Sequence, residues 1–110
     1  MNIYDVGVLA ANAVTAQPNR PATALINDSA DARVVLFRVE RGQHVAVHTS
    51  VSTVLLLVVS GTGVVSGADG ERDVRAGQLV AYDPQEPHGM RAKDEQLVIA
   101  AVIAPRPAAR

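Results

Sequence analysis

The chain has 110 residues, of which 48% are hydrophobic and 19% are charged, with no cysteine and a formal net charge of −1 at pH 7. This length predicts one domain with one core, and the apolar content excludes a disordered chain. The balanced charge argues against nucleic acid as a partner, and the absence of cysteine excludes disulfides, thiolate metal sites and cysteine nucleophiles.

The longest apolar runs, residues 54–59 and 97–104, are far shorter than the roughly 20 residues that a membrane-spanning helix needs. The N-terminus also lacks the positive charge and apolar stretch of a secretory signal. We therefore expect no membrane partner and a cytoplasmic protein.

The first half of the chain predicts two strands after an ambiguous start. Residues 6–14 fit either a strand or a short helix, and both alternatives stay open. Residues 33–40 are short and rich in β-branched side chains, which favours a strand. Residues 44–50 alternate, and this pattern predicts a strand with His44, Ala46, His48 and Ser50 on one face.

The second half of the chain continues as short strands separated by turns. Residues 54–59 are continuously apolar and predict a central strand that is buried on both faces and ends at the glycines of residues 60–63. Val64 and Val65 continue into a hairpin-type turn at residues 66–70, and the chain returns through residues 72–75. Further strands are expected at residues 79–82, 88–93 and 97–103. No helical period follows residue 20, so the pattern predicts an all-β sandwich or barrel.

A first motif resembles the cupin superfamily, in which a glycine is followed after five residues by His-x-His, then by a glutamate and a second glycine. Gly42, His48 and Gly61 occupy their expected positions. The second histidine of that motif falls on Ser50 and the glutamate on Val54, so two metal-ligand positions are lost.

A second cupin motif runs from a glycine through a proline-rich loop to a histidine. Gly77, Pro84, Pro87 and His88 follow it, whereas Asp83 replaces the usual first proline and Ala92 the final asparagine. The resemblance implies a double-stranded β-helix, or jelly-roll, barrel. We expect residues 1–110 to form a single cupin domain with a core at about 22–104, an N-terminal segment at 1–20 and a loose tail at 105–110.

The resemblance also implies which side chains face the barrel interior. His48 and His88 match two of the four ligands of a metal-bearing cupin, which predicts at most a weakly bound divalent metal, completed by water or by substrate. His44 shares a predicted strand face with His48, but about 13 Å would separate their Cα atoms, so His44 is interpreted as a rim histidine. Ser50, Tyr82 and Met90 are the candidate ligand-binding residues of the same cavity, with core packing as the alternative for Tyr82 and Met90.

Cupins include enzymes and binding proteins on one scaffold, so the fold does not select a function. The depleted ligand set favours a small-molecule-binding protein that is non-catalytic or weakly specialised. Two alternatives remain: a metal-dependent enzyme of the oxygenase or isomerase type that uses His48 and His88, and a structural or interaction module.

A homodimer is the expected assembly, because the N-terminal segment carries apolar residues that a small domain has difficulty burying alone. These residues are Ile3, Val6, Val8 and Leu9. The alternative is that the segment folds back on its own barrel.

Overall fold

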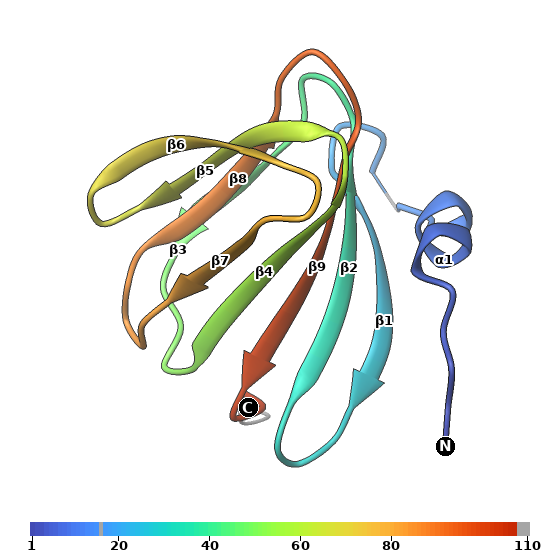
Figure 1. The fold of residues 1–110 in the computed structure, drawn as a ribbon, viewed down its shortest axis with the longest axis vertical. Helices are drawn as coiled ribbons and strands as arrows, with labels where there is room; N and C mark the ends of the chain where they lie inside the picture. Colours follow the sequence, from blue (N-terminus) through green and yellow to red (C-terminus); the bar gives the residue numbers. More distant parts are fainter. Residues whose placement is uncertain (16, 108–110) are drawn as a thin grey trace.

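The structure, a computed structural model, describes residues 1–15 and 17–107 (Figure 1). In this part of the chain one short helix, α1 (Val6–Asn12), precedes a series of strands. The strands are β1 (Ala22–Asp28), β2 (Arg33–Val39), β3 (His44–His48), β4 (Thr53–Ser60), β5 (Thr62–Gly67), β6 (Gly70–Arg75), β7 (Leu79–Tyr82), β8 (His88–Ala92) and β9 (Leu97–Ala104). The predicted all-β class is confirmed. The strand β1 was not predicted.

The strands form two antiparallel sheets that face one another. The five-stranded sheet has the order β1-β2-β9-β4-β7, and the four-stranded sheet has the order β3-β8-β5-β6. From β2 onward the chain crosses repeatedly between the sheets: β3, β5, β6 and β8 lie in one, and β4, β7 and β9 in the other. This is the winding of a double-stranded β-helix, so the predicted jelly-roll barrel is confirmed.

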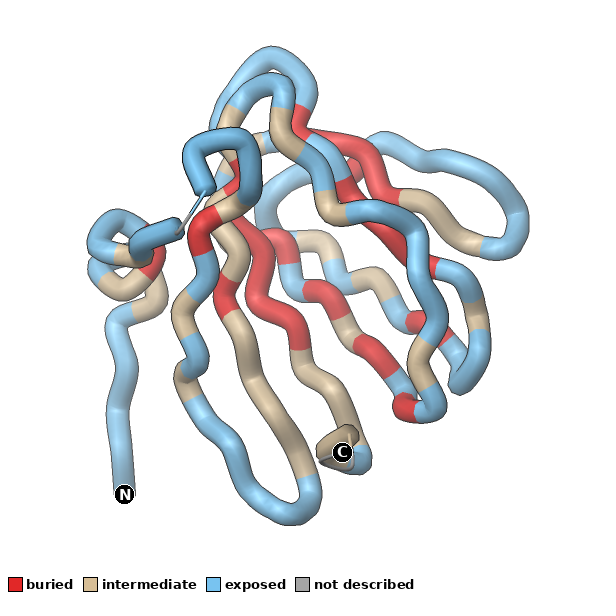
Figure 2. The backbone as a smooth tube through the Cα atoms, turned by 180° about the vertical axis from the view of Figure 1, so that it is seen from behind, coloured by how far each residue is buried: buried red, intermediate tan, exposed pale blue. Residues whose placement is uncertain are grey.

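The five-stranded sheet is apolar on both faces, and its central strands β4 and β9 are continuous apolar runs. Its inner face supplies the main core between the sheets, which includes the fully buried Leu56 and Ile99. Its outer face carries a smaller cluster in which Leu36 and Val98 pack against α1. Figure 2 shows that the buried positions lie mostly within the strands, while the segment before α1 is exposed.

Residues 6–12 adopt the helical alternative. The helix begins after Asp5, whose carboxylate accepts a hydrogen bond from the Val8 amide at 3.1 Å. At its C-terminal end the guanidinium of Arg38 donates to the carbonyls of Ala10, Ala11 and Ala13 at 2.7 to 3.1 Å, which satisfies acceptors that a helix end leaves unpaired. With seven residues α1 is far too short to cross a bilayer, and no longer helix occurs among the described residues.

The turn after β4 requires glycine at residue 61. Gly61 has a φ of 81°, a left-handed conformation that side chains disfavour. A Cβ at this position would also overlap the carbonyl oxygen of Gln96. The glycine that the sequence places at this bend is therefore needed both for its backbone angle and for close packing.

The prediction of a loose C-terminal tail is wrong for residues 105–107. The buried hydroxyl of Ser52 donates to the carbonyl of Pro105 at 2.6 Å. Arg106 forms an ion pair with Asp28 of β1, which lowers the pKa of that carboxyl. A hydrogen bond and an ion pair therefore anchor residues 105 and 106 of this segment. Residues 108–110 lie outside the described part of the chain.

Candidate functional site

The strand β3 departs from the simple alternation that the sequence predicts. It pairs with β8 through Val45 opposite Met90 and His48 opposite His88, and a register shift separates the two pairs. Between the two pairs, Ala46 and Val47 of β3 therefore lie opposite Gly89 of β8 alone, and two residues opposite one is the signature of a β-bulge. The prediction that His44 and His48 share one face is wrong, because the bulge turns Val45 and His48 toward the same cavity.

The bulge is accommodated by a close approach of β3 to β8 at Gly89. A Cβ at this position would lie only 3.0 Å from the Val45 carbonyl oxygen and 3.2 Å from the Cα of Val47. A larger residue would push the two strands apart. The glycine next to His88 thus allows the two histidines to meet.

His48 and His88 form a cross-strand pair at the cavity wall. Their ring centroids are 4.2 Å apart, and the rings meet edge to face at 61°. His88 is buried and His48 is exposed, so the pair extends from the wall of the barrel to its mouth. This placement brings together the two histidines that the sequence analysis selected.

Each histidine is oriented by a backbone carbonyl two residues earlier in the chain. Nδ1 of His48 lies 2.9 Å from the Ala46 oxygen, and Nδ1 of His88 lies 3.0 Å from the Glu86 oxygen. A carbonyl only accepts, so each Nδ1 carries the proton and donates it. In the neutral ring Nε2 then keeps a lone pair, and no described residue forms a hydrogen bond with it.

The histidines line a cavity of about 290 Å³ between the two sheets. Ser50 and Met90 line it as well, at the positions where the sequence predicted ligand contacts. The other walls are mostly apolar and come from both sheets and the tail: Phe37, Val45, Thr49, Val54, Leu56, Ala101, Ile103 and Pro107. Sequence reasoning missed Phe37, Val45 and the tail residue Pro107, because only the folded arrangement brings these segments to the same space.

Tyr82 lies beside this cavity and is not among its lining residues. Its ring packs against His88 with a centroid distance of 5.1 Å, and its hydroxyl donates to the Ser66 carbonyl at 2.7 Å. Burial, with a smaller contribution from the charges of Glu86 and Asp69, raises its pKa to about 12. The structure therefore favours the core-packing interpretation of Tyr82, whose hydroxyl is already occupied.

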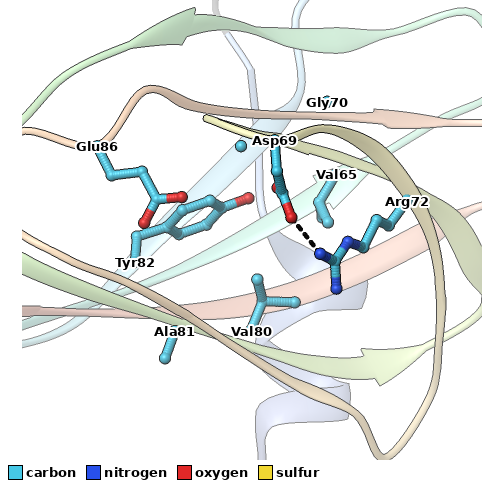
Figure 3. A pocket seen from close by; sticks show the side chains of 9 residues that line it. Val65, Asp69, Gly70, Arg72, Val80, Ala81, Tyr82 and Glu86 are labelled. Atoms are coloured by element: carbon cyan, nitrogen blue, oxygen red, sulfur yellow. Dashed lines mark hydrogen bonds and ion pairs between the residues drawn. The ribbon is translucent and has the colours of Figure 1, made fainter.

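The far side of Tyr82 borders a second, smaller hollow of about 180 Å³ (Figure 3). Glu86 and Asp69 stand near its rim, and Asp69 forms an ion pair with Arg72. The Glu86 carboxylate also accepts from the amides of Asp83 and Ala68, at 3.1 and 3.3 Å. These polar groups are engaged with one another or with the backbone, so this hollow is the weaker candidate for a site.

His44 borders a third hollow, outside the histidine pair. This hollow of about 490 Å³ is also lined by Arg20 and Thr23 from the N-terminal side and by Phe37 and Val45. His44 is exposed. Its placement fits the interpretation of a rim histidine and separates it from the pair of His48 and His88.

The donor set does not fit the complete metal centre that the resemblance to cupins implies. Only His48 and His88 supply metal-binding nitrogens at the cavity, Ser50 offers a neutral hydroxyl, and Val54 offers no donor. No group of three or more histidine, aspartate or glutamate side chains with metal-binding geometry occurs among residues 1–15 and 17–107. A protein site for a catalytic divalent metal normally supplies three ligands, so two imidazoles alone make an incomplete one.

Comparison with solved structures supports the fold independently. The chain is similar to the TT1209 protein from Thermus thermophilus, with 25% identity, a TM-score of 0.86 and coverage of 97% of this chain and 100% of the other. A protein with a double-stranded β-helix domain from Klebsiella pneumoniae is 21% identical, with a TM-score of 0.83 and coverage of 99% of this chain and 94% of the other. An RmlC-like cupin from Desulfovibrio desulfuricans is 24% identical, with a TM-score of 0.79 and coverage of 96% of this chain and 97% of the other.

A comparison with curated proteins finds no match to this chain. The sequence profile of the cupin domain, in contrast, matches residues 35–103, which is more than half of the chain. This matched segment contains His48, His88 and most of the cavity walls. The chain therefore belongs to the cupin family.

Proposed function

We propose that this protein binds a small, mainly apolar molecule with one protic head group in the barrel, without a complete protein-ligated metal. The observation that carries this proposal is the cavity of about 290 Å³ whose walls are apolar except near His48 and His88. Ligand sites typically combine such apolar walls with a few placed polar groups. A purely structural module would gain more from a filled barrel interior, since empty volume costs stability.

The histidine pair indicates the chemistry of the head group. Each Nδ1 is committed to a carbonyl, so two Nε2 lone pairs remain on neighbouring rings. Two acceptors side by side favour a ligand that donates hydrogen bonds, such as a hydroxyl or an undissociated acid. Ser50 can accept or donate beside them. Because His88 is buried, a ligand hydroxyl that reaches its Nε2 leaves water. That hydroxyl must then be paired with an acceptor, which favours its hydrogen bond to Nε2.

A metal-dependent enzyme of the oxygenase or isomerase type is the competing function. The observation in its favour is that histidine ligands of metals commonly donate their second ring nitrogen to a carbonyl, as both histidines do here. Metal analysis of protein purified without chelator separates the two functions. A stoichiometric transition metal that is lost in His88→Ala would overturn the non-metal proposal.

Binding of p-cresol and p-xylene, followed by NMR titration, tests the head-group chemistry. The two molecules have similar size, and only p-cresol carries a hydroxyl. We expect wild-type protein to bind p-cresol roughly tenfold more tightly, in line with about 1 kcal/mol for one hydrogen bond. His88→Ala should remove this preference, whereas His44→Gln, which changes the rim histidine, should preserve it.

A cavity-filling variant provides the steric control. Ala101 is buried on β9 and lines the cavity, so Ala101→Ile should block both molecules while leaving the histidines in place. If neither molecule shifts resonances of the cavity residues in wild-type protein, or if binding survives in Ala101→Ile, the proposed site is wrong.

A further inference from the structure

The inner face of the five-stranded sheet stays open beside the edge of the other sheet. The four-stranded sheet ends at β3, whereas the five-stranded sheet continues past β2 to β1. Phe37 of β2 packs against the main core, and its register partner Thr23 of β1 shares this inner face. Thr23 is nevertheless exposed and Phe37 only half-buried. Both residues line the hollow of about 490 Å³ that His44 borders, which we call the edge hollow.

The edge hollow carries positive and no negative charge. Its ionisable residues are Arg20 and His44, and no described aspartate or glutamate lines it. The exposed guanidinium of Arg20 has no carboxylate partner within residues 1–15 and 17–107. The arginines that do form such pairs are Arg33, Arg38, Arg72, Arg91 and Arg106. An anion that enters the hollow therefore meets a free cation and no repelling carboxylate.

A turn before β1 holds Arg20 at the hollow. The amide of Arg20 donates to the carbonyl of Gln17 at 3.0 Å. The side-chain amide of Gln43 donates to the carbonyl of Pro18, also at 3.0 Å. These bonds tie the segment before β1 to the turn between β2 and β3. Because this backbone is already fixed, binding a ligand there costs less conformational entropy.

The free edge of β3 directs a backbone donor to the same hollow. The amide of Ala92 donates to the carbonyl of Gln43 at 3.3 Å, so Gln43 and Val45 turn their backbone groups toward β8. In an antiparallel pair the residue between two such positions turns its groups the other way. The N–H of His44 therefore points away from β8, to the edge that borders the hollow.

The rest of the lining combines apolar and polar side chains. Phe37, Val45 and Pro21 are the apolar members, and Phe37 and Val45 also line the histidine cavity, so the two spaces share them as a wall. Asn19 and Thr23 add an amide and a hydroxyl. Apolar walls with a few polar groups, in a volume between about 300 and 1,000 Å³, are typical of small-molecule sites.

We infer that the edge hollow is a second binding site, separate from the histidine cavity, and that it takes a small aromatic carboxylate. The carboxylate pairs with the guanidinium of Arg20 and accepts from the β3 edge at His44. The aromatic body packs on Phe37 and Val45. Arginine suits this ligand class because its planar fork matches the two oxygens of a carboxylate.

NMR titration with 4-methylbenzoate and 4-methylbenzamide at neutral pH tests the requirement for charge. The two molecules are similar in shape, and only the first is negatively charged, because a carboxylic acid with a pKa of about 4 is ionised there. We expect wild-type protein to bind 4-methylbenzoate with a roughly millimolar Kd and about tenfold more tightly than the amide. Resonances of Arg20, Thr23 and His44 should shift.

Two arginine variants separate this site from general attraction between charges. Arg20→Gln should abolish the preference for the carboxylate. Arg41→Gln, the matched control, should preserve it, since Arg41 is exposed in the turn between β2 and β3 and does not line the hollow. Both variants lose the same charge, and circular dichroism verifies that each is folded.

Two filling variants locate the bound carboxylate. Thr23→Trp fills the edge hollow from an exposed position on β1 and should block 4-methylbenzoate. Ala101→Ile fills the histidine cavity and should leave this binding unchanged.

Three results would overturn the proposal. The first is the absence of shifts in the lining residues at about 10 mM 4-methylbenzoate. The second is an equal loss of the preference in Arg20→Gln and Arg41→Gln. The third is binding that is lost in Ala101→Ile and kept in Thr23→Trp, which would place the carboxylate in the histidine cavity.

Discussion

The two faces of the five-stranded sheet are built from the same strands and have opposite surroundings. On β4, Leu56 points inward, is 2% exposed and lines the cavity, while the adjacent Leu57 points outward and is 44% exposed. The inner face packs against the other sheet, which carries His48 and His88. On the outer face, Leu57 of β4 and Leu79 of β7 are exposed, and no element of the described residues covers them. The prediction that β4 is buried on both faces is therefore wrong for the outer face, where Leu57 is exposed. A continuous apolar run does not by itself show that both faces of a strand are covered.

The largest difference in stability between the two faces is expected when Leu56→Ala is compared with Leu57→Ala. Leu56→Ala enlarges a cavity in the core and should lower the free energy of unfolding by about 2 to 4 kcal/mol. Leu57→Ala, at a concentration low enough for monomers, should cost less than about 1 kcal/mol. Urea unfolding measures both values. Equal costs in the monomer would mean that the outer face is packed within the chain.

An intermediate effect is expected from Arg38→Met, which removes the donors that hold α1 on the outer face. Three carbonyls at the helix end lose a charged partner, so the free energy of unfolding should fall by about 1 to 3 kcal/mol. Thermal or urea unfolding provides the measurement. Arg72→Met breaks a mostly exposed ion pair and should cost less than about 1 kcal/mol. Equal losses in both variants would show that Arg38 does not anchor the helix.

The smallest effect on stability is expected at alkaline pH, and it comes from Tyr82, which packs on the inner side of the barrel. Burial raises the pKa of Tyr82 from 10.0 to about 12, so the neutral phenol favours the folded state. This contribution is fully present below about pH 10 and is lost as the pH rises toward 12. Tyr82→Phe should remove this alkaline loss of stability, whereas Tyr4→Phe, at an exposed position before α1, should not.

Urea unfolding between pH 8 and pH 12 gives the stability profiles of these two variants, and near-ultraviolet absorbance follows ionisation of the phenol. An unchanged alkaline slope in Tyr82→Phe would show that another group of the folded chain is responsible.

Much of the fold could be predicted because its signals are local. The short β-branched runs at β2, β4 and β9 and the glycines at residues 42, 61 and 77 mark strands and turns directly. The strand β1 was missed because Ala22–Asp28 mixes alanines with Asn27 and Asp28 and has no clear alternation. It pairs with β2 across one sheet edge, and this pairing, rather than intrinsic preference, defines it as a strand.

The candidate site was predicted only in part. The spacing of the two motifs selected His48 and His88, and the structure places them opposite one another on β3 and β8. The alternating sequence from His44 to Ser50 does not predict the bulge that turns Val45 toward the cavity. It depends on the close contact with Gly89 of another strand, which a single-strand pattern cannot encode.

Residue types at fixed spacings were enough to predict the cupin fold, two barrel histidines and the absence of a full ligand set. The folded chain was needed to establish which side chains share the cavity, which ring nitrogen each histidine leaves available and which half of the outer sheet is uncovered by the described residues. These properties arise from contacts between residues that are distant in the chain, such as Arg38 with the end of α1 and Ser52 with Pro105. Local pattern fixes where a strand runs, whereas packing between strands fixes what each face meets.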